Sequence, residues 1–539
     1  MYCTMKCSLG KRSLGCFSVA RFAKFLACEV FASGFFFAAL PLYAAETNAK
    51  SSLAQSVTIE DLRRHVQVLA DDTFEGREAG SRGGRAAAGY LGREFQKCKL
   101  AAGAGPGGYY QSFGGQYRNI LGLLEGSDPR LKQEVIVIGA HYDHVGYGSA
   151  QNSYGPTGYI HNGADDNASG AAGLTEIVEA FSRLEARPKR SILFAFWDGE
   201  EKGLLGSKHW VSQPTLPLAR VRLMINLDMI GRLRNDYVEI YGSRTGRDLR
   251  RLVSLQNRDS NLRLDFSWKM RDDSDHYSFY EKGIPVLFVH TGLHDDYHRP
   301  SDDAEKVNLA GMRRVVQLLC GVLYELADEA QLPGFRQAGR TDSPHTQQEL
   351  ERPLPPLPGR LGLSWDLGAE REGQGLRVSR ITRRSAAARA GIQPGDHIVQ
   401  FDGEAVQTGE KLQARVLAAP NSASIVLRRP GSAEPVKLGV QLAGQPVRLG
   451  ISWRVDPAEP QAVALSRIVA GSPAARAGLR LNDRIYEVSG KSFASSDEFR
   501  GLVTETSRPL ELLVEREGRL HVVTLEPPAP AADKPAAAE

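Results

Sequence analysis

The sequence predicts an α/β domain with a mostly parallel central sheet, followed by two small β-rich domains. Three observations support this prediction: short apolar runs alternate with helical segments in the first part of the chain, a proline-rich stretch then ends that pattern, and the remainder of the chain repeats itself once. Strands that alternate with helices are typical of an α/β layer. The length of 539 residues fits several domains, because one domain usually takes ~100–200 residues.

The composition and the charge bound the class of protein. With 42% hydrophobic and 24% charged residues, the chain is neither disordered nor collagen-like. Residues 1–45 carry five basic side chains and one acidic side chain, and the whole chain has a formal charge of +4, so the rest of the chain is neutral. The six side chains are Lys6, Lys11, Arg12, Arg21, Lys24 and Glu29. A neutral body gives no indication of nucleic acid or of an anionic membrane as a partner.

Residues 1–45 are predicted to be a signal peptide. Basic residues lead into an apolar run over residues 30–40, and small residues follow at Ala44 and Ala45. A helix needs ~20 residues to cross the ~30 Å core of a bilayer, and this run is far shorter. We therefore expect an exported protein, periplasmic or secreted, with no stable membrane span after removal of the signal. An uncleaved membrane anchor is the alternative.

The cysteines indicate a fold that does not depend on disulfides. Four of the six cysteines lie in the predicted signal, which leaves Cys98 and Cys320 in the mature chain. One disulfide is possible and a disulfide framework is not, so packed cores must hold the fold.

The elements of the α/β domain follow from the apolar pattern. Residues 58–99 look helical at both ends, with a glycine-rich loop between the helices. Apolar runs that suit buried strands occur at residues 134–140, 191–197, 221–228 and 284–290. A helical apolar period covers residues 169–186 and 303–327. This alternation predicts the sheet but not the order of its strands.

The second part of the chain contains an internal repeat. Residues 385–406 (SAAARAGIQPGDHIVQFDGEAV) match residues 472–493 (SPAARAGLRLNDRIYEVSGKSF) at a spacing of 87. Two copies are too few for a solenoid, so the repeat predicts two similar small domains. Before them, residues 329–358 lose periodicity and end in a proline-rich stretch, which predicts a stiff, extended linker. The predicted boundaries are the α/β domain at 46–335, the linker at 336–358, the first repeat domain at 359–444, the second repeat domain at 447–527 and a flexible tail at 528–539.

Histidines and carboxylates gather where the predicted strands end. After successive strands stand His141 with Asp143, Glu200 with Glu201, Asp228, and His298, while Asp166 precedes the helix between the first two strands. The carboxyl ends of parallel strands meet at one edge of an open sheet, and ligands bind there. The sequence therefore predicts a ligand site at this edge.

This set of side chains suits two divalent metal ions that share a site. Such a site needs one bridging carboxylate and terminal nitrogen or oxygen ligands, with a position left for water. Two imidazoles and three carboxylates around two ions leave one positive charge, which a bound hydroxide neutralises. The set contains no cysteine, which favours a catalytic over a structural site. The candidates are His141, Asp166, Glu201, Asp228 and His298.

Five motifs carry these residues in order: HYD at 141–143, GADDNASG at 163–170, DGEE at 198–201, NLDMIGR at 226–232 and YHRPSDD at 297–303. A sixth motif, SDH at 274–276, lies between the last two. Together, over residues 58–328, they resemble the M28 family of zinc aminopeptidases. The resemblance implies a phosphorylase/hydrolase-like fold with two zinc ions bridged by Asp166. It places His141, Asp166 and Asp228 on one ion, and Asp166, Glu201 and His298 on the other.

The resemblance also implies catalytic roles. The metals would polarise the scissile carbonyl and deliver hydroxide, while Glu200 would accept the proton of the water and pass it to the leaving amine. Asp143 would orient His141 through its far ring nitrogen. Tyr297 would donate to the tetrahedral oxyanion, as in some family members. Asp302 is a candidate partner of a metal ligand.

Several residues near the site keep a structural alternative. The remaining histidines are interpreted as structural or substrate-facing: His144, His161, His290 and His294. Asp165 is expected to cap the following helix, and it is also an alternative to Asp166 as the bridge. The sequence itself does not say which of Glu200 and Glu201 binds metal; that assignment comes from the resemblance.

Each repeat domain has a leucine-glycine-apolar stretch, at residues 361–363 and 449–451, and a serine- and alanine-rich turn that leads into a strand. These features resemble PDZ domains, in which backbone amides bind a peptide carboxylate and the peptide adds to a sheet as an edge strand. Binding of peptide ends and scaffolding of the enzyme are both open.

The predicted function is that of an exported dinuclear zinc aminopeptidase with two PDZ domains. The alternatives are a dipeptidase, a carboxypeptidase-like or a glutaminyl-cyclase-like enzyme of the same fold, or a catalytically weak PDZ-based peptide-binding protein. Only a few residues separate 111–113 from 118–120, so there is no room for the protease-associated domain that relatives often carry there.

Overall fold

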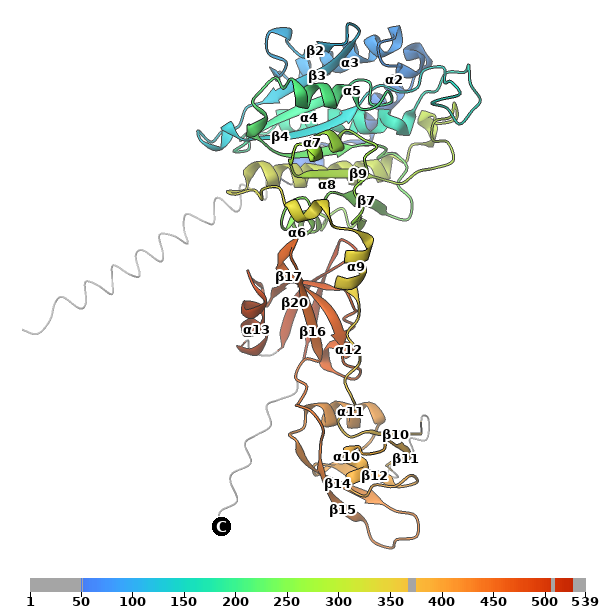
Figure 1. Ribbon diagram of the computed structural model, residues 1–539, viewed down its shortest axis with the longest axis vertical. Helices are drawn as coiled ribbons and strands as arrows, with labels where there is room; N and C mark the ends of the chain where they lie inside the picture. The colour runs from blue at the N-terminus through green and yellow to red at the C-terminus, as the bar shows by residue number, and fades with distance from the viewer. Residues whose placement is uncertain (1–49, 51, 367–374, 506–508, 527–539) are drawn as a thin grey trace, which may run out of the picture.

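The computed structural model describes residues 50, 52–366, 375–505 and 509–526. The predicted signal peptide and the predicted tail lie outside these residues. Figure 1 shows three domains in a row: the α/β domain at one end, the second repeat domain in the middle and the first repeat domain at the other end.

In the described residues, the α/β domain has a central sheet of nine strands in the order β1-β3-β5-β4-β6-β9-β7-β8, with β2 paired to β3. β4 pairs in parallel with β5 and β6, and β6 pairs in parallel with β9. The bounds are β1 (Ala101–Ala102), β2 (Tyr110–Phe113), β3 (Tyr117–Leu124), β4 (Val135–His141), β5 (Ser191–Trp197), β6 (Val221–Leu227), β7 (Tyr237–Tyr241), β8 (Arg263–Phe266) and β9 (Val286–His290). The predicted fold class is confirmed.

The four apolar runs form the parallel centre of the sheet as β4, β5, β6 and β9. Every residue of β4 and β5 is buried, as expected for strands that are covered on both faces. The hairpin of β2 and β3 and the outer strands β7 and β8 are not among the elements predicted from the sequence. In that hairpin Phe113 pairs with Tyr117, so no domain is inserted between them.

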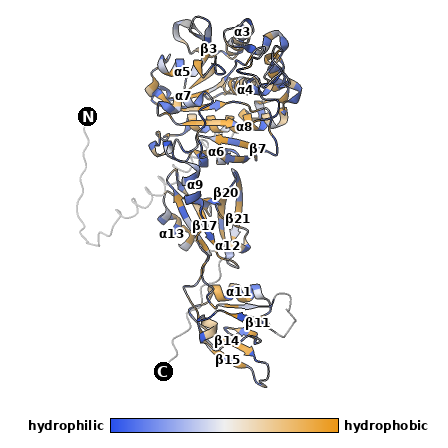
Figure 2. Cartoon of the chain, turned by 45° about the vertical axis from the view of Figure 1, so that its right-hand side comes forward, coloured by the Kyte–Doolittle hydropathy of each residue, from blue (hydrophilic) through white to orange (hydrophobic). Residues whose placement is uncertain are grey.

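Helices cover both faces of the sheet. α2, α3, α4, α6 and α8 pack on the face that carries Ile136 and Ile138, whereas α5 and α7 pack on the face that carries Val137 and Trp197. Figure 2 shows hydrophobic residues along the strands between these layers. The bounds are α2 (Ile59–Leu69), α3 (Arg82–Lys97), α4 (Gly170–Ser182), α5 (Leu205–Ser212), α6 (Leu249–Gln256), α7 (His276–Glu281) and α8 (Leu309–Asp328).

The linker is partly helical, which corrects the prediction of an extended segment. α9 (Pro344–Glu351) lies inside it. Ser343 Oγ accepts a hydrogen bond from Thr346 N at 3.3 Å, and Pro344 takes the first helical position, where a missing N–H costs nothing. The proline-rich run begins at Pro353, and it follows the helix without interrupting it.

The two repeat domains share one architecture. Each has a six-stranded antiparallel sheet, in the order β10-β11-β12-β14-β15 with β13 on β12, and β16-β17-β18-β20-β21 with β19 on β18. Equivalent ion pairs close equivalent turns, Asp396 with Arg429 at 2.9 Å and Asp483 with Arg516 at 2.7 Å. The bounds in the first domain are β10 (Leu363–Trp365), β11 (Leu376–Ile381), α10 (Ala386–Arg389), β12 (His397–Phe401), β13 (Glu404–Ala405), α11 (Gly409–Ala418), β14 (Ser422–Arg428) and β15 (Val436–Gln441). In the second they are β16 (Ile451–Asp456), β17 (Glu459–Ile468), α12 (Pro473–Arg476), β18 (Arg484–Val488), β19 (Lys491–Ser492), α13 (Ser496–Glu505), β20 (Leu510–Arg516) and β21 (Arg519–Leu525).

The second repeat domain is docked on the α/β domain. Arg250 of α6 binds Glu515 with Nη2 3.0 Å from Oε1, and Leu264 N donates to Glu517 O at 2.8 Å. Leu255 packs on a small apolar cluster that includes Tyr486. The chain therefore runs past the second repeat domain as α9 and then forms the first repeat domain. It turns back after that to form the second repeat domain, which is docked on the α/β domain.

Cys98 and Cys320 are both free, so no disulfide joins them. Among the described residues, no helix combines the length and the apolar character that crossing a membrane requires.

Candidate metal centre

The predicted ligands meet at the carboxyl edge of the parallel strands. His141 is the last residue of β4, and Asp228 directly follows β6. Glu201 lies in the turn after β5, and His298 lies in the loop after β9. Asp166 belongs to the irregular turn that leads into α4. Each side chain therefore comes from a different connection at one end of the sheet.

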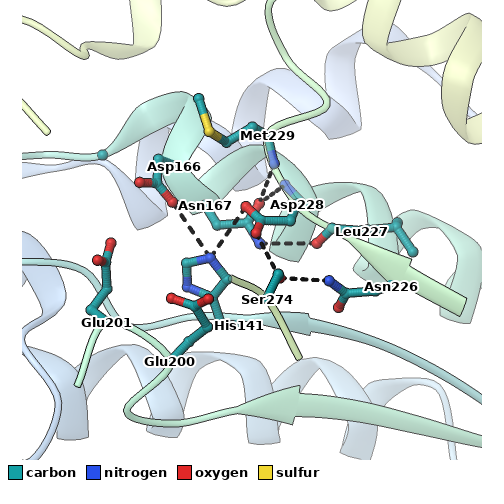
Figure 3. Close-up of polar contacts among 12 residues, drawn as sticks. His141, Asp166, Asn167, Glu200, Glu201, Asn226, Leu227, Asp228, Met229 and Ser274 are labelled. Atoms are coloured by element: carbon teal, nitrogen blue, oxygen red, sulfur yellow. Dashed lines mark hydrogen bonds and ion pairs between the residues drawn. The ribbon is translucent and has the colours of Figure 1, made fainter. Parts of the chain in front are cut away.

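Three of these side chains form a first cluster. His141 Nε2 lies 3.4 Å from Asp166 Oδ1 and 3.3 Å from Asp228 Oδ1. Figure 3 shows both carboxylates directed at this nitrogen. Ligand atoms of the three residues all lie within 4.8 Å of one another, and all three residues are buried.

A second cluster shares Asp166 with the first. His298 Nε2 lies 3.0 Å from Asp166 Oδ2 and 3.2 Å from Glu201 Oε2. His144 Nδ1 lies 2.8 Å from Glu201 Oε1 and 3.8 Å from Asp166 Oδ2. Asp166 thus offers one carboxylate oxygen to each cluster.

The ring nitrogens face the carboxylates as those of metal ligands do. His141 Nδ1 donates to Asp143 O at 3.2 Å, and His298 Nδ1 donates to Asn152 O at 2.9 Å. The Nε2 lone pair of each ring is then left facing carboxylate oxygens, an arrangement that calls for a cation between them. Ligand atoms about 2.0–2.1 Å from a tetrahedral ion lie roughly 3.3 Å apart, close to the nitrogen–oxygen distances in both clusters. The two clusters are compatible with metal binding.

Asp143 contacts the far ring nitrogen of His141 through its backbone carbonyl, and its carboxylate makes further contacts. Its carboxylate Oδ1 lies 3.8 Å from His141 Nδ1, so the hydrogen bond to the ring comes from its backbone carbonyl. The carboxylate accepts the backbone amides of Glu200 at 3.1 Å and Glu201 at 3.4 Å. Asp143 therefore ties the end of β4 to the turn that carries both glutamates.

Two further side chains hold the carboxylate ligands. Asp302 Oδ2 accepts the backbone amides of Asp165 at 2.8 Å and Asp166 at 3.1 Å. Ser274 Oγ donates to Asp228 Oδ2 at 2.8 Å. Asp302 thus fixes the backbone of Asp166, and Ser274 fixes the carboxylate of Asp228.

Asp165 does not cap the following helix, so that prediction was wrong. Its Oδ1 accepts the backbone amide of Gly231 at 2.6 Å, and its Oδ2 lies 3.2 Å from His294 Nε2. Asn167 Oδ1 instead accepts the amide of Gly170, the first residue of α4, at 2.9 Å. The irregular turn places Asn167 next to the free amide and directs Asp165 away from Asp166 toward the loop after β6.

Besides His294, the three other histidines named near the site have distinct surroundings. His144 contacts both Glu201 and Asp166, so it belongs to the second cluster. His161 Nε2 is 2.7 Å from Ser153 Oγ and holds a loop. His290 Nδ1 accepts the amide of Gly292 at 2.6 Å.

The two adjacent glutamates differ in their electrostatics. Burial raises the pKa of Glu200 well above its ordinary value, and the nearby carboxylates of Glu201 and Asp228 add to the rise. Burial also acts on Glu201, but hydrogen bonds with His144 and His298 outweigh it and hold the pKa of Glu201 well below its ordinary value. Opposed pKa shifts on neighbouring carboxyls are typical of sites in which the two groups have different tasks.

A buried arginine that the sequence analysis did not single out organises the loops around the clusters. Arg77 is 1% exposed. Its guanidinium donates to the backbone carbonyls of Leu69, Tyr142, Asn162 and Gly163 at 2.6–2.9 Å. Burial lowers the pKa of Arg77 to about 10, although the charges of nearby carboxylates such as Asp166 act to raise it. No periodicity or strand end marks this residue in the sequence.

A cavity of about 40 Å³ lies in front of the first cluster. Its wall includes Tyr297, whose ring stacks on His298 with 4.0 Å between centroids. It also includes Arg271 and Asp273, from the loop between β8 and α7, which the sequence analysis did not name.

Family models match the chain in three places. Residues 119–323 match the model of peptidase family M28, and residues 377–429 and 465–516 match the PDZ domain model. The first match contains every candidate metal ligand, and the other two lie within the repeat domains.

Relatives are similar over part of their length. Leupeptin-inactivating enzyme 1 of Streptomyces exfoliatus is 29% identical over 284 residues, which cover 51% of this chain and 58% of that protein. A probable leucine aminopeptidase of Arthroderma benhamiae is 31% identical over 224 residues, which cover 37% of this chain and 56% of that protein. The chain thus spans little more than half the length of these relatives. A solved zinc aminopeptidase from Bacillus subtilis has 15% identity and a TM-score of 0.42, covering 52% of this chain and 98% of that one.

Proposed function

This chain carries a peptidase domain of family M28 and two PDZ domains, and from this premise we propose that it is a zinc-dependent aminopeptidase that removes residues from the amino end of peptides. The observation that carries the proposal is the pair of clusters joined by Asp166. The α/β domain alone would contain the active site.

Two zinc ions are proposed, one held by His141, Asp166 and Asp228 and the other by Asp166, Glu201 and His298. Asp166 is proposed as the bridge because its two oxygens face two different histidines. The nitrogen and oxygen donor set without cysteine supports a catalytic site. When bound, zinc supplies a Lewis acid that polarises the scissile carbonyl and lowers the pKa of water.

Glu200 is proposed as the general base that takes a proton from the attacking water and gives it to the leaving amine. It lines the same cavity as His141 and Asp228, and its backbone amide is fixed by Asp143. Glu201 has its carboxylate engaged by two histidines, so it suits the role of ligand rather than base.

Tyr297 is proposed to donate its hydroxyl to the oxyanion that forms on the scissile carbonyl. Its position on the cavity wall, stacked on His298, supports this role. Asp143 and Arg77 would act indirectly, since their contacts hold the backbone that carries the reacting groups.

The PDZ domains are proposed to bind peptide ends or to scaffold the enzyme, and the basic and apolar leader over residues 1–45 is proposed to direct export to the periplasm or the exterior. The leucine-glycine-apolar loops at 361–363 and 449–451 support the first of these proposals.

The experiment is a panel of aminoacyl-p-nitroanilides and amino-blocked peptides, assayed with and without a chelator. We expect hydrolysis of substrates with a free amino terminus, loss of the activity with the chelator, and recovery on addition of zinc. Cleavage of blocked peptides but not of free amino termini would contradict the aminopeptidase assignment and favour a carboxypeptidase-like enzyme. Full activity in the chelator would contradict the metal mechanism.

A further inference from the structure

A large cavity lies between the two PDZ domains. Its volume is about 780 Å³, large enough for several residues of a peptide. Its wall is formed by the start of β16, the end of α13, the last part of the linker and part of α11. The cavity therefore lies beside β16, the strand at one end of the strand order in the sheet of the second repeat domain.

The wall of this cavity is apolar and basic. Leu449, Ile451 and Val503 supply apolar surface. Among the described residues, four arginines and no acidic residue contribute to the wall, namely Arg360, Arg448, Arg467 and Arg500. Arg360 is occupied by backbone carbonyls such as Val416 O at 2.7 Å, and Arg500 is exposed. The cavity is thus complementary to an extended peptide with an apolar end and a negative charge.

The backbone of the loop before β16 allows a close approach. Gly450 has φ +83°, and a Cβ atom there would lie 2.1 Å from the Cβ atom of Ser472. The loop is followed at once by β16, which is at one end of the strand order of its sheet. A peptide carboxylate at this loop and a peptide strand beside β16 would therefore be continuous.

The direction of such a peptide follows from strand geometry. A chain whose carboxyl end lies at the start of β16 can lie beside the strand only if it runs antiparallel to it. Its amino end then points toward the end of β16, at Asp456. Asp456 forms an ion pair with Arg244 of the α/β domain, so β16 ends at the enzyme. Figure 1 shows the second repeat domain between the α/β domain and the first repeat domain.

We propose that the second PDZ domain holds the free carboxyl end of a long peptide substrate and directs its amino end toward the metal centre of the same chain. The inference rests on the proposed aminopeptidase function and specifies its substrate: extended peptides with a free carboxyl terminus. Short substrates would reach the metal centre without this domain. The first PDZ domain, at the far end of the molecule, does not take this role.

Two variants distinguish an effect of the cavity wall from a general effect of charge on the protein. R467E/R500E reverses two charges of the cavity wall. R380E is the control, because Arg380 pairs with Ser364 in the first repeat domain as Arg467 pairs with Ser452 in the second, and it does not line the cavity. All three proteins are the full chain, and rates are normalised to hydrolysis of an aminoacyl-p-nitroanilide.

The substrates are two peptides of one sequence, one ending in a carboxylate and the other in an amide. A length of roughly 30 residues reaches about 100 Å when extended, enough to engage both sites. We expect kcat/KM to be about tenfold higher or more for the carboxylate peptide, mainly through KM, as for a charge-assisted hydrogen bond. The preference is expected to persist in R380E and to disappear in R467E/R500E. Equal rates for both peptides in the unmodified chain, or equal loss of the preference in both variants, would overturn the proposal.

Binding distinguishes this proposal from the enzyme assignment. Calorimetry of the same peptides with the E200Q chain is expected to show tighter binding of the carboxylate peptide, again lost in the R467E/R500E background. If nitroanilides are not cleaved but this binding preference exists, the aminopeptidase assignment is wrong, and the proposed binding of peptide carboxyl ends by the second PDZ domain is supported. If nitroanilides are cleaved and no binding preference exists, the proposed role of the second PDZ domain is wrong and the aminopeptidase assignment is unaffected.

Discussion

Arg244 of the α/β domain forms an ion pair with Asp456, the last residue of β16 in the second PDZ domain. The same guanidinium lies 3.3 Å from the ring centroid of Trp268. From Trp268 the chain runs through Arg271 and Asp273 to Ser274. Arg271 and Asp273 line the small cavity in front of the first cluster, and the hydroxyl of Ser274 binds the ligand candidate Asp228. One short segment therefore joins the PDZ interface to the metal centre.

Replacing Asp456 with alanine is expected to destabilise the docked domains. The side chains of Arg244 and Asp456 are 11% and 3% exposed, and Arg244 retains an ion pair with Asp342 at 2.7 Å after the change. The change therefore removes one charge-assisted contact at a buried interface, which costs ~1.5–3 kcal/mol in the free energy of unfolding. Urea denaturation measures the change. Glu125→Ala removes an exposed ion pair with Lys132, 3.0 Å apart, and is expected to cost less than about 1 kcal/mol. Equal losses in the free energy of unfolding would show that the pair of Arg244 and Asp456 stabilises the protein no more than an exposed ion pair does.

Glu200→Gln and Glu201→Gln are expected to fail in different ways. Glu200 contacts none of the three histidines of the clusters in a hydrogen bond or ion pair of the described residues, so its amide variant should retain the metal content of the unmodified chain. Turnover should fall by about 10²–10⁴-fold, the usual contribution of a general base. Glu201→Gln weakens contacts with both His144 and His298, so it should lose metal as well as activity.

Metal analysis together with nitroanilide hydrolysis makes this comparison. Loss of metal in the Glu200 variant, with retention in the Glu201 variant, would reverse the two roles.

Arg77→Met is expected to unfold the loops around the site. The change removes donors from four backbone carbonyls, three of them in buried contacts, and leaving such groups unsatisfied costs at least about 3 kcal/mol in total. Arg82→Met is the matched control, since Arg82 has a side chain that is 75% exposed and pairs with Glu75. Its effect on the free energy of unfolding should stay within about 0.5 kcal/mol. Similar effects in the two variants would mean that the loops do not depend on Arg77.

The sequence predicts those parts of the site that follow from strand ends. His141 and Asp228 are found because each ends a short apolar run, and such runs become neighbouring parallel strands. Arg77 is missed because its contacts are to backbone carbonyls of distant loops, and no pattern of side chains records them. The outer strands β7 and β8 are missed because their residues alternate in exposure and pair at the edge of the sheet, where the apolar signal is weak.

The docking of the second PDZ domain has no signal in the sequence either. Arg250 and Glu515 are separated by 265 residues, and both look like ordinary surface charges in their own segments. The repeat, by contrast, is legible because equal spacing of the same residue types builds the same turn twice, as with Asp396 and Asp483.

Away from the metal centre, Glu176 of α4 gives the α/β domain a pH dependence. Its side chain is 2% exposed, Oε2 accepts the amide of Thr58 at 3.3 Å, and Oε1 has no hydrogen-bond partner in the described residues. His65 Nε2 lies 3.8 Å from Oε1, and Glu179 is a second neighbour. Burial, reinforced by the charge of Glu179, raises the pKa of Glu176 from 4.5 to about 8.

Glu176→Gln is therefore expected to stabilise the protein at neutral and alkaline pH. Between the two pKa values the folded chain holds a proton that the unfolded chain has released, so stability falls as the pH rises through this window. Glutamine cannot ionise, so the variant does not lose this stability. In the unmodified chain the loss in the free energy of unfolding reaches up to ~4 kcal/mol near pH 8. Glu179→Gln should act in the opposite direction, because a hydrogen bond with His65 lowers the pKa of Glu179 despite its burial. Urea denaturation at about pH 5 and pH 8 measures both; a Glu176→Gln effect that does not grow with pH would show that this carboxyl is already charged in the folded chain.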